Sequence, residues 1–400
     1  MKFQIQINAQ QHDNFIKKHP LGNLLQSSDW AKVKDNWKSE LISILDDRDE
    51  ILASSLVLIK TLPLGYSMLY IPRGPILDFK DEKLLDFYLI ELKKWAKTRK
   101  ALFIKFDPNI IYETGKFKAD MSKNSEAEQL INLLKRKGIK HSGFTMGVSD
   151  TIQPRVQANE ALTEKIESIY PKHTRRLMKD AMMRGVKVSR VDESGLKEFS
   201  RLIDLTENRK SVSLRNFDYF QKLMSMYKED AYLHLATVNV VEKQEELKKI
   251  LIQIEKDLSE TSEEQKKRLT RLTDQKRSTE KYIKELESFD SEAEDCVIAG
   301  ILSIKFGETV EMLYAGMDEK FKKFYPQYLL YTLTFQESFE AGAHWANMGG
   351  IKGTLDDGLS KFKSNFNPDV QFLVGEFTLA VHPFLSSVGL WAYNKRKSSH

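Results

Sequence analysis

Strand-like runs of apolar residues occur in two stretches of the chain, and in both stretches they follow the same order. In the first stretch, a strand over 41–45 turns tightly through 46–50 into a strand over 51–60, followed by YSMLYIPRGPIL, a helix over 83–98 and the strand ALFIKFDP. In the second, the strand YLHLATVNV is followed by CVIAGILSIKF, VEMLYAGM, a helix over 325–341 and AHWANMGG. A strand meander followed by a helix and a further strand predicts a mixed sheet with helices packed against it. The sequence therefore predicts the same folding unit twice.

This order of elements is typical of the N-acetyltransferase (GNAT) superfamily. We therefore expect an α/β fold of α+β mixed sheets, with two tandem acetyltransferase-like domains. The pattern of the second unit is complete by the stretch LVGEF, yet an apolar tail remains to be buried, so we expect that tail to return and pack on the first unit. The expected first domain is thus 1–155 plus 377–400, and the expected second domain is 156–376.

An insertion distinguishes the two units. Where the first unit has the turn DDRDE, the second has residues 241–295, which contain no Gly or Pro and are rich in Glu, Lys and Gln. Apolar residues at helical spacing flank the polar stretch SETSEE; they are Leu247, Leu251, Ile254 and Leu258 before it and Leu269, Leu272, Ile283 and Leu286 after it. We expect two antiparallel helices over 241–292, a coiled-coil arm that projects about 30 to 35 Å at 1.5 Å per residue. Such an arm serves either dimerisation or the binding of a long partner.

The composition predicts a folded protein of a reducing compartment. Of 400 residues, 41% are hydrophobic and 10% aromatic, enough for two or three domains with cores of their own. The single Cys296 excludes an internal disulfide, and MKFQIQINAQ lacks the apolar segment of a secretory signal, so we expect a cytoplasmic protein. The longest uncharged run, 377–393, is interrupted by His382 and Pro383 and is short for a membrane span. The NKRK stretch that follows it leaves a peripheral contact with the inner face of the plasma membrane open.

Positive charge is concentrated in one predicted helix. In YPKHTRRLMKDAMMRG, the Pro suits a first helical turn and the last Gly suits a helix end. Lys172, Arg175, Arg176 and Lys179 fall on one face of this helix, and residues 170–190 hold seven Lys or Arg against one Asp. The whole chain, by contrast, has 62 basic and 57 acidic residues. The basic face either contacts a polyanion, namely a nucleic acid, a membrane surface or a diphosphate-bearing substrate, or is simply solvated.

Several common site motifs are missing from the sequence. The eight His residues form no HxxxH pair, and no GxxxxGK or GxGxxG run follows a strand, which disfavours metal, nucleoside-triphosphate and dinucleotide sites. Cys296 is a poor nucleophile candidate, because the adjacent Glu294 and Asp295 oppose its thiolate. Neither unit has the Gly-rich turn Q/R-x-x-G-x-G/A with which acetyl-CoA enzymes of this fold bind the pyrophosphate. We therefore expect no cofactor, and coenzyme A is a poor donor candidate.

Six stretches taken together resemble one family. They are LQSSDWAKVKDNW, YIPRGPILDF, FIKFDPN, TENRKSVSLRNFDYF, EMLYAGMDEKFKKFYPQYLLY and GGIKGTLDDGLSKFKSNFNP. In combination they are similar to the Fem-type (FemABX) peptidoglycan interpeptide-bridge aminoacyltransferases, with the closest resemblance to the MurM branch. The resemblance covers nearly the whole chain and implies two tandem acetyltransferase-like domains, the second with a coiled-coil arm. It also implies transfer of an amino acid from aminoacyl-tRNA to the stem-peptide lysine amine of a lipid-linked peptidoglycan precursor, lipid II.

The resemblance gives roles in acceptor binding to individual residues. A Lys in the stretch W-x-x-V-K and an R-x-x-x-Y pair hold the acceptor's diphosphate in the family, and they correspond here to Lys34, Arg215 and Tyr219. These residue types suit the role, because Arg offers a planar fork for a phosphate, and residues four apart share one face of a helix. Tyr314 in EMLYAGM matches a Tyr that lines the acceptor site, although a core or cross-strand Tyr is the plainer interpretation.

Phe362 and Lys363 match the pair that the resemblance links to the reaction itself. Aminolysis of an aminoacyl ester passes through a tetrahedral intermediate, and a fixed cation near its oxyanion, or near the terminal phosphates of the tRNA, lowers the barrier. If 359–364 form a strand, Lys361 shares the face of Lys363; if they form a tight loop, only Lys363 is expected to matter. No general base is assigned, since Asp107 in KFDPN is equally well explained as a turn residue.

Given this resemblance, the basic helix face, continued by Arg184, Lys187 and Arg190, suits the phosphates of a tRNA acceptor stem, and the arm is placed to brace the same RNA. An anionic membrane is the competing partner for that face. Two other functions stay open, an acyl-CoA-dependent N-acetyltransferase with an atypical donor loop and a non-catalytic coiled-coil interaction protein. The transferred amino acid is expected to be Ala or Ser, with Gly as the third candidate.

Overall fold

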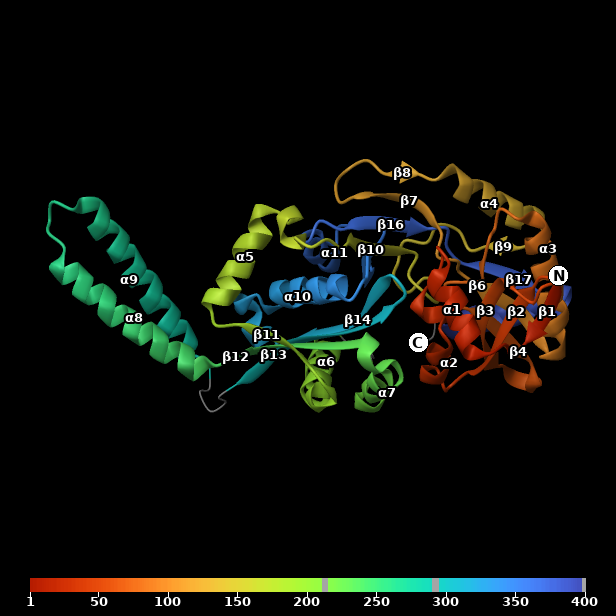
Figure 1. The fold of residues 1–400 in the computed structure, drawn as a ribbon, viewed down its shortest axis with the longest axis horizontal. Coiled ribbons are helices and arrows are strands. Elements are labelled where there is room, and N and C mark those ends of the chain that lie inside the picture. Colours follow the sequence, from red (N-terminus) through yellow and green to blue (C-terminus); the bar gives the residue numbers. More distant parts are fainter. Residues whose placement is uncertain (211–214, 290–294, 398–400) are drawn as a thin grey trace.

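The computed structural model describes residues 1–210, 215–289 and 295–397 and has a mixed α/β fold (Figure 1). The described residues form two mixed sheets with helices against them, and an arm of two helices projects from the end of the molecule opposite the N-terminus (Figure 1). This is the fold class that the order of strands and helices predicts. No helix in these ranges combines the length and the hydropathy that a membrane crossing requires.

The first sheet contains the first copy of the repeated unit. Its elements are β2 (Lys38–Leu45), β3 (Ile51–Thr61), β4 (Ser67–Ile71), α3 (Glu82–Thr98) and β6 (Ala101–Phe106). β2, β3 and β4 form an antiparallel meander, and β6 pairs with β4 in parallel along its whole length. α3 begins after the N-cap Asp81, and its buried Leu84, Tyr88, Leu92 and Trp95 share one face, which holds the helix against the sheet.

The second sheet contains the second copy. Its elements are β12 (Ala231–Val238), β13 (Cys296–Phe306), β14 (Thr309–Met317), α10 (Pro326–Glu340) and β15 (Trp345–Gly350). The pairing repeats that of the first copy, with an antiparallel meander of β12, β13 and β14 and a β15 that is parallel to β14. The duplication predicted from the apolar pattern is therefore confirmed.

The two copies differ where their parallel strands meet. β14 and β15 pair only between Thr309–Glu311 and Trp345–Asn347, and the ladder ends there although both strands continue. In the first copy, the corresponding ladder runs to the last residue of β4. Backbone groups that leave a ladder become available to other partners. We call the opening between 312–317 of β14 and 348–350 of β15 the wedge.

The chain passes between the two sheets on either side of the second copy. β10 (Val156–Ala161) lies between β15 and β16 (Asp369–Leu373), and β17 (Phe377–Ala380) lies between β6 and β9 (Lys140–His141). The chain leaves the first sheet after β9 to enter the second as β10, and it leaves the second after β16 to enter the first as β17. β10 and β17 are each paired on both sides, so the two connections between the sheets begin and end in interior strands or beside them.

One hairpin does not follow the expected division of the chain. β7 (Ile111–Lys116) and β8 (Ser122–Lys123) lie within 1–155, yet β7 pairs with β16 and extends the second sheet. The domain bounds 1–155 plus 377–400 and 156–376 stay a prediction.

The other strands and α-helices outside the arm are β1 (Lys2–Ile5), β5 (Ile76–Leu77), β11 (Lys187–Val191), α1 (Ala9–Lys18), α2 (Ser28–Val33), α4 (Ser125–Arg136), α5 (Lys172–Met183), α6 (Leu196–Lys210), α7 (Phe217–Tyr227), α11 (Gly358–Ser364) and α12 (Pro383–Lys397).

The arm consists of α8 (Val240–Glu260) and α9 (Lys266–Leu286), inserted between β12 and β13 at the position of the short β2–β3 turn of the first copy. Its interior contains Leu247, Ile254, Leu272, Ile283 and Leu286, all buried. An ion pair of 2.7 Å between Lys276 and Glu255 joins the two helices on the outside. The end of the expected arm range, from 290 onward, lies outside the described residues.

A continuous core joins the two units. Apolar side chains of α1 and α2, such as Ile16 and Trp30, belong to the same buried cluster as Phe220 of α7 and Leu302 of β13. Polar contacts cross the same junction, and one is the hydrogen bond of 2.7 Å between the Ser27 and Tyr227 hydroxyls. The position of α2 relative to α7 is therefore fixed by packing.

A buried carboxyl in β10 makes the stability of the second sheet depend on pH. The side chain of Glu160 is fully buried, and burial raises its pKa from 4.5 to about 8, with Asp369 adding to the rise and Lys116 opposing it. A carboxyl whose folded pKa is raised stabilises the fold in its protonated form, and that contribution is lost as the pH rises through the folded pKa.

We therefore expect Glu160→Gln to be more stable than the parent at about pH 9, on the order of a few kcal/mol, and the difference to shrink toward pH 5. Thermal unfolding of both proteins across this pH range measures it. A stability difference that stays constant with pH would show that Glu160 does not titrate as described.

Candidate functional site

Lys34 lies at the C-terminal end of α2, at the junction between the units. α2 begins at the N-cap Ser27, whose hydroxyl accepts a hydrogen bond from the Trp30 amide at 3.2 Å. After one and a half turns, the Lys34 side chain lies over the indole of Trp30, with Nζ 4.8 Å from the ring centroid. Its Nζ also donates to the Tyr219 hydroxyl of α7 at 3.3 Å. Lys34 therefore connects the first unit to the second.

Arg215 and Tyr219 are brought to Lys34 by the start of α7. The N-cap Asn216 accepts from the Tyr219 amide at 3.2 Å, which begins the helix directly after Arg215. The Arg215 guanidinium lies 5.1 Å from the Tyr219 ring centroid, and the Tyr314 ring of β14 meets the Tyr219 ring edge-on at 5.9 Å. The four residues that the sequence linked to acceptor binding thus come together, and we call Lys34, Arg215, Tyr219 and Tyr314 the Lys34 cluster.

The electrostatics of the Lys34 cluster favour an anion. Burial, and to a smaller extent the positive charge of Arg215, lowers the pKa of Lys34 to about 8. Burial also raises the pKa of Tyr219, so its hydroxyl stays protonated and able to donate. Arg215 is exposed to solvent. An anion with two charges placed beside Lys34 and Arg215 would relieve the repulsion between them.

Lys363 lies on a helix, not on the strand or tight loop that the sequence left as alternatives. α11 begins at the N-cap Asp357, whose carboxylate accepts from the Leu359 amide at 2.8 Å. Lys363 is 3% exposed, and its Nζ donates to the carbonyl oxygens of Gly349 at 2.9 Å and Gly350 at 3.1 Å. Lys361 is exposed on another face of the helix. Neither the expected strand nor the expected tight loop is present. A helix of seven residues can start from an N-cap alone, without a long repeat of apolar residues that would indicate it in the sequence.

The two glycines at the end of β15 allow this approach. Gly349 has φ +85°, and a Cβ at this residue would lie 3.7 Å from the Lys363 Nζ and 4.0 Å from the Met312 carbonyl oxygen of β14. A Cβ on Gly350 would lie 2.5 Å from the Pro154 side chain. The ammonium of Lys363 therefore lies at the mouth of the wedge, two residues along β14 from Tyr314. The paired Gly in WANMGG is the feature of the sequence that could have indicated this approach.

Phe362, the other member of the pair, belongs to an aromatic cluster. Its ring lies 5.2 Å from Tyr331, 5.5 Å from Phe366 and 5.8 Å from Tyr328, in edge-on arrangements. These contacts anchor α11 to α10 and thereby hold Lys363 in place. The catalytic role of Phe362 stays a prediction, and its contacts are those of a packing residue.

Asp107 is buried, and its two carboxylate oxygens have different partners. Its Oδ1 accepts from the Tyr70 hydroxyl and from the Arg73 amide, both at 3.0 Å, and its Oδ2 forms an ion pair of 3.5 Å with the Arg73 guanidinium. Burial raises its pKa to about 6, against the effect of Arg73. Arg73 also donates to the Pro154 carbonyl at 2.8 Å, beside Gly350. This geometry favours Asp107 as the residue that orients Arg73 over a role as a free base.

Glu311 is a polar residue of this junction that the sequence did not indicate. It lies at the last β14–β15 pair before the wedge and accepts from the Asn23 side chain of the first unit at 2.9 Å. Burial raises its pKa to about 7, with the charge of Arg73 opposing the rise. A cavity of about 240 Å³ lies beside it and is lined mainly by amide side chains, among them Asn23, Gln157 and Asn347.

The basic face of α5 is formed as expected. Thr174, Leu177, Met178 and Ala181 face the core. The four predicted residues, Lys172, Arg175, Arg176 and Lys179, are exposed, and among the described residues no carboxylate lies within ion-pair distance of any of them. α5 lies on the side of the second unit that faces the arm (Figure 1).

The expected continuation of this face is engaged within the chain. Arg184 forms an ion pair of 3.3 Å with Glu285 of the arm, and Lys187 forms one of 3.6 Å with Glu242. Arg190 donates to the Glu229 carbonyl at 2.8 Å. Arg184 and Arg190 therefore attach α5 and β11 to their surroundings. Of the predicted basic face, only the four residues of α5 lack an ion pair or a carbonyl partner within the described residues.

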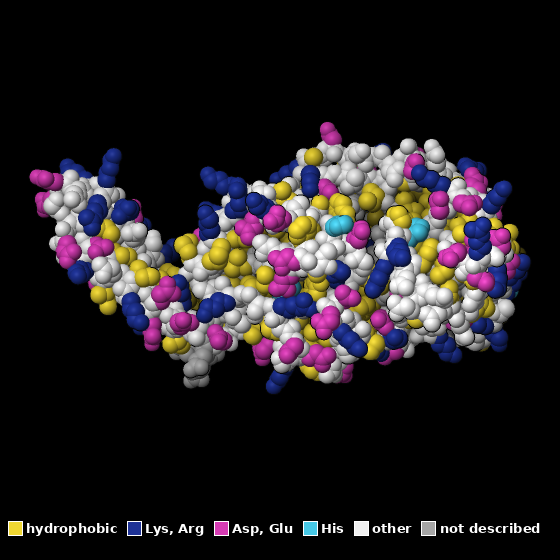
Figure 2. Space-filling model, in the orientation of Figure 1, with side chains coloured by type: hydrophobic (Ala, Val, Ile, Leu, Met, Phe, Trp, Pro, Cys, Tyr) yellow, Lys and Arg dark blue, Asp and Glu magenta, His cyan; other side chains and the backbone are white. Residues whose placement is uncertain are grey.

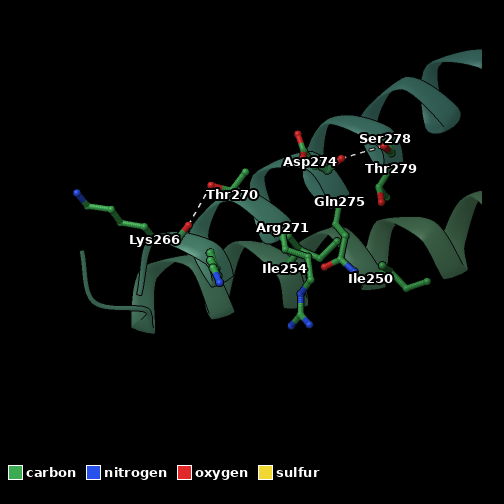
Figure 3. A pocket seen from close by; sticks show the side chains of 10 residues that line it. Ile250, Ile254, Lys266, Thr270, Arg271, Asp274, Gln275, Ser278 and Thr279 are labelled. Carbon is green, nitrogen blue, oxygen red and sulfur yellow. Dashed lines mark hydrogen bonds between the residues drawn. The ribbon is translucent and has the colours of Figure 1, made fainter. Parts of the chain in front are cut away.

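A shallow groove runs between the two helices of the arm (Figure 3). It is lined by Ile250 and Ile254 of α8 and by polar residues of α9, including Arg271 and Gln275. The Thr270 and Ser278 hydroxyls on its α9 side donate to carbonyls one turn earlier. Lys, Arg, Asp and Glu side chains alternate along the visible face of the arm (Figure 2). The charges on this face of the arm are therefore mixed, in contrast with the four cations of α5.

Neither a metal centre nor a thiol nucleophile emerges. Within the described ranges, no group of three His, Cys, Asp or Glu side chains is placed to hold a metal ion. Burial raises the pKa of Cys296, and Asp295 and Asp318 add to the rise. Cys296 is therefore protonated at neutral pH, as its acidic neighbours in the sequence indicate.

Comparison with known proteins places the chain among relatives of similar length. A family model described as the FemAB family matches residues 7–393. Two similar relatives are Staphylococcus aureus proteins named "Lipid II:glycine glycyltransferase", from strains bovine RF122 / ET3-1 and NCTC 8325 / PS 47. Each is 29% identical over 396 residues, which covers 93% of this chain and 91% of the relative. A solved structure described as "Crystal structure of FemX" matches with a TM-score of 0.77 and 28% identity, over 95% of this chain and 97% of that chain.

Proposed function

The chain belongs to the FemAB family, and from this premise we propose that it is an aminoacyltransferase that moves an amino acid from aminoacyl-tRNA to the stem-peptide lysine amine of lipid II. The product is the interpeptide bridge of peptidoglycan. The family resemblance inferred from six motifs is confirmed by the family match, whereas the MurM branch stays a prediction. We propose that the protein is cytoplasmic and meets its lipid-linked acceptor at the inner face of the membrane.

The observation that carries the proposal is the position of the Lys34 cluster beside the wedge. Lys34 and Arg215 offer two cations to a diphosphate, Tyr219 offers a hydroxyl, and Tyr314 of the same cluster lies on the strand that borders the wedge. Lys363 donates to the carbonyls of Gly349 and Gly350 on β15, the strand that borders the wedge opposite β14. A diphosphate at the cluster would leave the attached sugar and peptide free to extend toward Lys363.

The chemistry proposed for the wedge is ester aminolysis. The lysine amine attacks the ester carbonyl carbon, the C–N bond forms, the negative charge moves to the carbonyl oxygen, and collapse breaks the C–O bond and releases the tRNA hydroxyl. The proton lost by the amine ends on the leaving hydroxyl, carried by the substrates or a water. Lys363, held by two backbone carbonyls, supplies fixed positive charge for the oxyanion or for the terminal tRNA phosphates.

Removing the charge of α5 is expected to weaken tRNA binding. A variant with Lys172, Arg175 and Arg176 all replaced by Gln loses three exposed cations but no buried contact, so its fold should be unchanged. The logarithm of tRNA affinity should then fall less steeply with the logarithm of salt concentration, by about one unit of slope for each lost phosphate contact. Filter binding or fluorescence anisotropy across a salt series measures the slope, and a slope equal to the parent's would refute the assignment.

The amino acid and the donor can be tested in one assay. We propose Ala or Ser on the resemblance to the MurM branch, and glycine enters as the amino acid in the names of the two relatives. The assay combines the purified protein with lipid II and, in separate reactions, tRNA charged with labelled Ala, Ser or Gly. Label is expected on lipid II in at least one reaction, and none from labelled acetyl-CoA. Transfer from acetyl-CoA alone would favour an N-acetyltransferase, and no transfer from any donor would favour a non-catalytic protein.

A further inference from the structure

α12 has two faces that are both apolar, and only one of them is covered. On the inner face, the Ser386 hydroxyl donates to the Leu102 carbonyl of β6, and the Tyr393 ring packs edge-on against Phe103 at 6.1 Å. A Cβ on Gly389 would lie only 2.5 Å from the Leu102 side chain, which shows how closely the helix lies on the first sheet. The inner face therefore fixes the direction of the outer one.

The outer face carries large exposed apolar side chains. Phe384 is 90% exposed, Leu385 43%, Val388 63% and Trp391 64%. Their positions, at intervals of three and four, place them along one side of the helix. A helix that is apolar all round normally has a second apolar surface against it, and nothing in the described residues covers this one.

The charge around α12 indicates what covers the outer face. Residues 377–400 contain no Asp or Glu, and Lys395, Arg396 and Lys397 follow the apolar stretch. The Lys395 Nζ lies 5.2 Å from the Trp391 ring centroid. An aromatic and aliphatic stripe that ends in Trp and a cluster of basic residues suits the headgroup region of an anionic bilayer, where apolar side chains enter the acyl boundary and cations meet lipid phosphates.

The end of α12 is linked to the Lys34 cluster through two further residues, Trp37 and Lys60. The Trp37 amide donates to the Lys34 carbonyl at 2.9 Å, and the Trp37 ring lies 5.4 Å from the Lys60 ammonium. The same ammonium lies 5.9 Å from the Tyr393 ring near the C-terminal end of α12. A short series of contacts thus joins the acceptor site to the exposed helix.

We propose that the outer face of α12 lies in the surface of an anionic lipid bilayer, with Phe384, Val388 and Trp391 in the headgroup boundary. In this orientation, the diphosphate of a lipid-linked acceptor leaves the bilayer next to Lys34 while its polyprenyl chain stays in the lipid. The link to the acceptor rests on the proposed function, whereas contact with the bilayer itself does not.

The test compares one triple variant with one double variant. Phe384→Ser/Val388→Ser/Trp391→Ser removes the stripe, and Ile90→Ser/Ile5→Ser removes exposed apolar side chains of α3 and β1, far from α12 in sequence, as the control. Co-sedimentation is measured with phosphatidylcholine vesicles that contain or lack phosphatidylglycerol. The parent and the control should bind the anionic vesicles, and the stripe variant should bind at least about tenfold more weakly. Equal binding of the parent and the stripe variant, or no binding of the parent, would overturn the proposal.

A second measurement does not require the triple stripe variant to fold, because it uses only the parent and a conservative single substitution. The difference between the fluorescence of the parent and that of Trp391→Phe reports Trp391 alone, and brominated lipids in the anionic vesicles should quench this difference signal. An unquenched Trp391 would overturn the proposal. So would a parent dimer that the stripe variant converts to a monomer in light scattering, since a second copy would then cover the stripe.

Transfer assays separate this inference from the proposed function. With lipid II in anionic vesicles, the stripe variant should be at least about tenfold slower than the parent; with a soluble acceptor that carries the diphosphate but no polyprenyl chain, the two should be equal. A parent inactive on both acceptors would refute the proposed function and leave the vesicle measurements to judge α12. A parent active on both, with the variant equal on both, would refute the inference alone.

Discussion

Replacing Lys363 by Met is expected to lower the rate of aminoacyl transfer by about 10²- to 10³-fold while leaving acceptor binding unchanged. Met keeps most of the aliphatic length, so the packing of α11 beside Phe362 is preserved, but the charge at the wedge is lost. A preorganised electrostatic contact of this kind is worth about 3 to 4 kcal/mol in the transition state. Single-turnover transfer from charged tRNA at saturating acceptor is the measurement.

The structure adds a second consequence for the same variant. The carbonyls of Gly349 and Gly350 lose their donor, and buried unpaired acceptors cost about 1 to 3 kcal/mol of folding stability each. The rate must therefore be measured well below the melting temperature of the variant. Lys361→Met is the matched control, because Lys361 is exposed on the same helix, and it should react at the parent rate. A Lys363→Met protein that is folded and reacts as fast as the parent would remove Lys363 from the mechanism.

Affinity for a diphosphate-bearing acceptor is expected to fall as the pH rises through about 8. Lys34 has a pKa lowered to about 8 by burial and by Arg215, so it is charged below this pH and neutral above it. A bound diphosphate favours the charged form, and the affinity should drop by up to about tenfold per pH unit above 8 until the pKa of the complex is reached. Equilibrium binding of the acceptor between about pH 6 and pH 10 measures the effect.

Two substitutions make this prediction specific to Lys34. Lys34→Arg keeps the charge across the whole range, because the guanidinium does not titrate there, and its binding curve should be flat. Lys34→Met should bind about 10- to 100-fold more weakly than the parent at neutral pH, the effect of losing a charge-assisted hydrogen bond, and should also be flat. A parent-like decline in the Lys34→Arg protein would assign the titration to another group, such as Glu311.

The sequence by itself determined the elements and their repetition. Strand and helix periods are local, so the two copies of the unit could be read from apolar spacing alone. The arm followed from the absence of Gly and Pro over 241–295 and from its apolar spacing. The exposed basic face of α5 was equally local, because residues three and four apart share a helix face wherever the helix lies.

Only the tertiary structure decided how these elements form a site. The transfer of the β7–β8 hairpin to the second sheet depends on which strand edges meet, and apolar strands of similar pattern do not distinguish between sheets. The Lys34 cluster joins residues about 180 positions apart through the packing of α2 on α7.

The wedge illustrates the same limit most clearly. The wedge exists because the β14–β15 ladder consists of only three residue pairs and then ends. Lys363 is held there by the carbonyls of Gly349 and Gly350. Arg73 is held nearby in a similar way, because it donates to the Pro154 carbonyl and forms an ion pair with Asp107. Hydrogen bonds to backbone carbonyls carry no signature in the side-chain sequence, because every residue has the same acceptor. For this reason the residue types of the site were readable in advance, whereas their partners were set only by the packed fold.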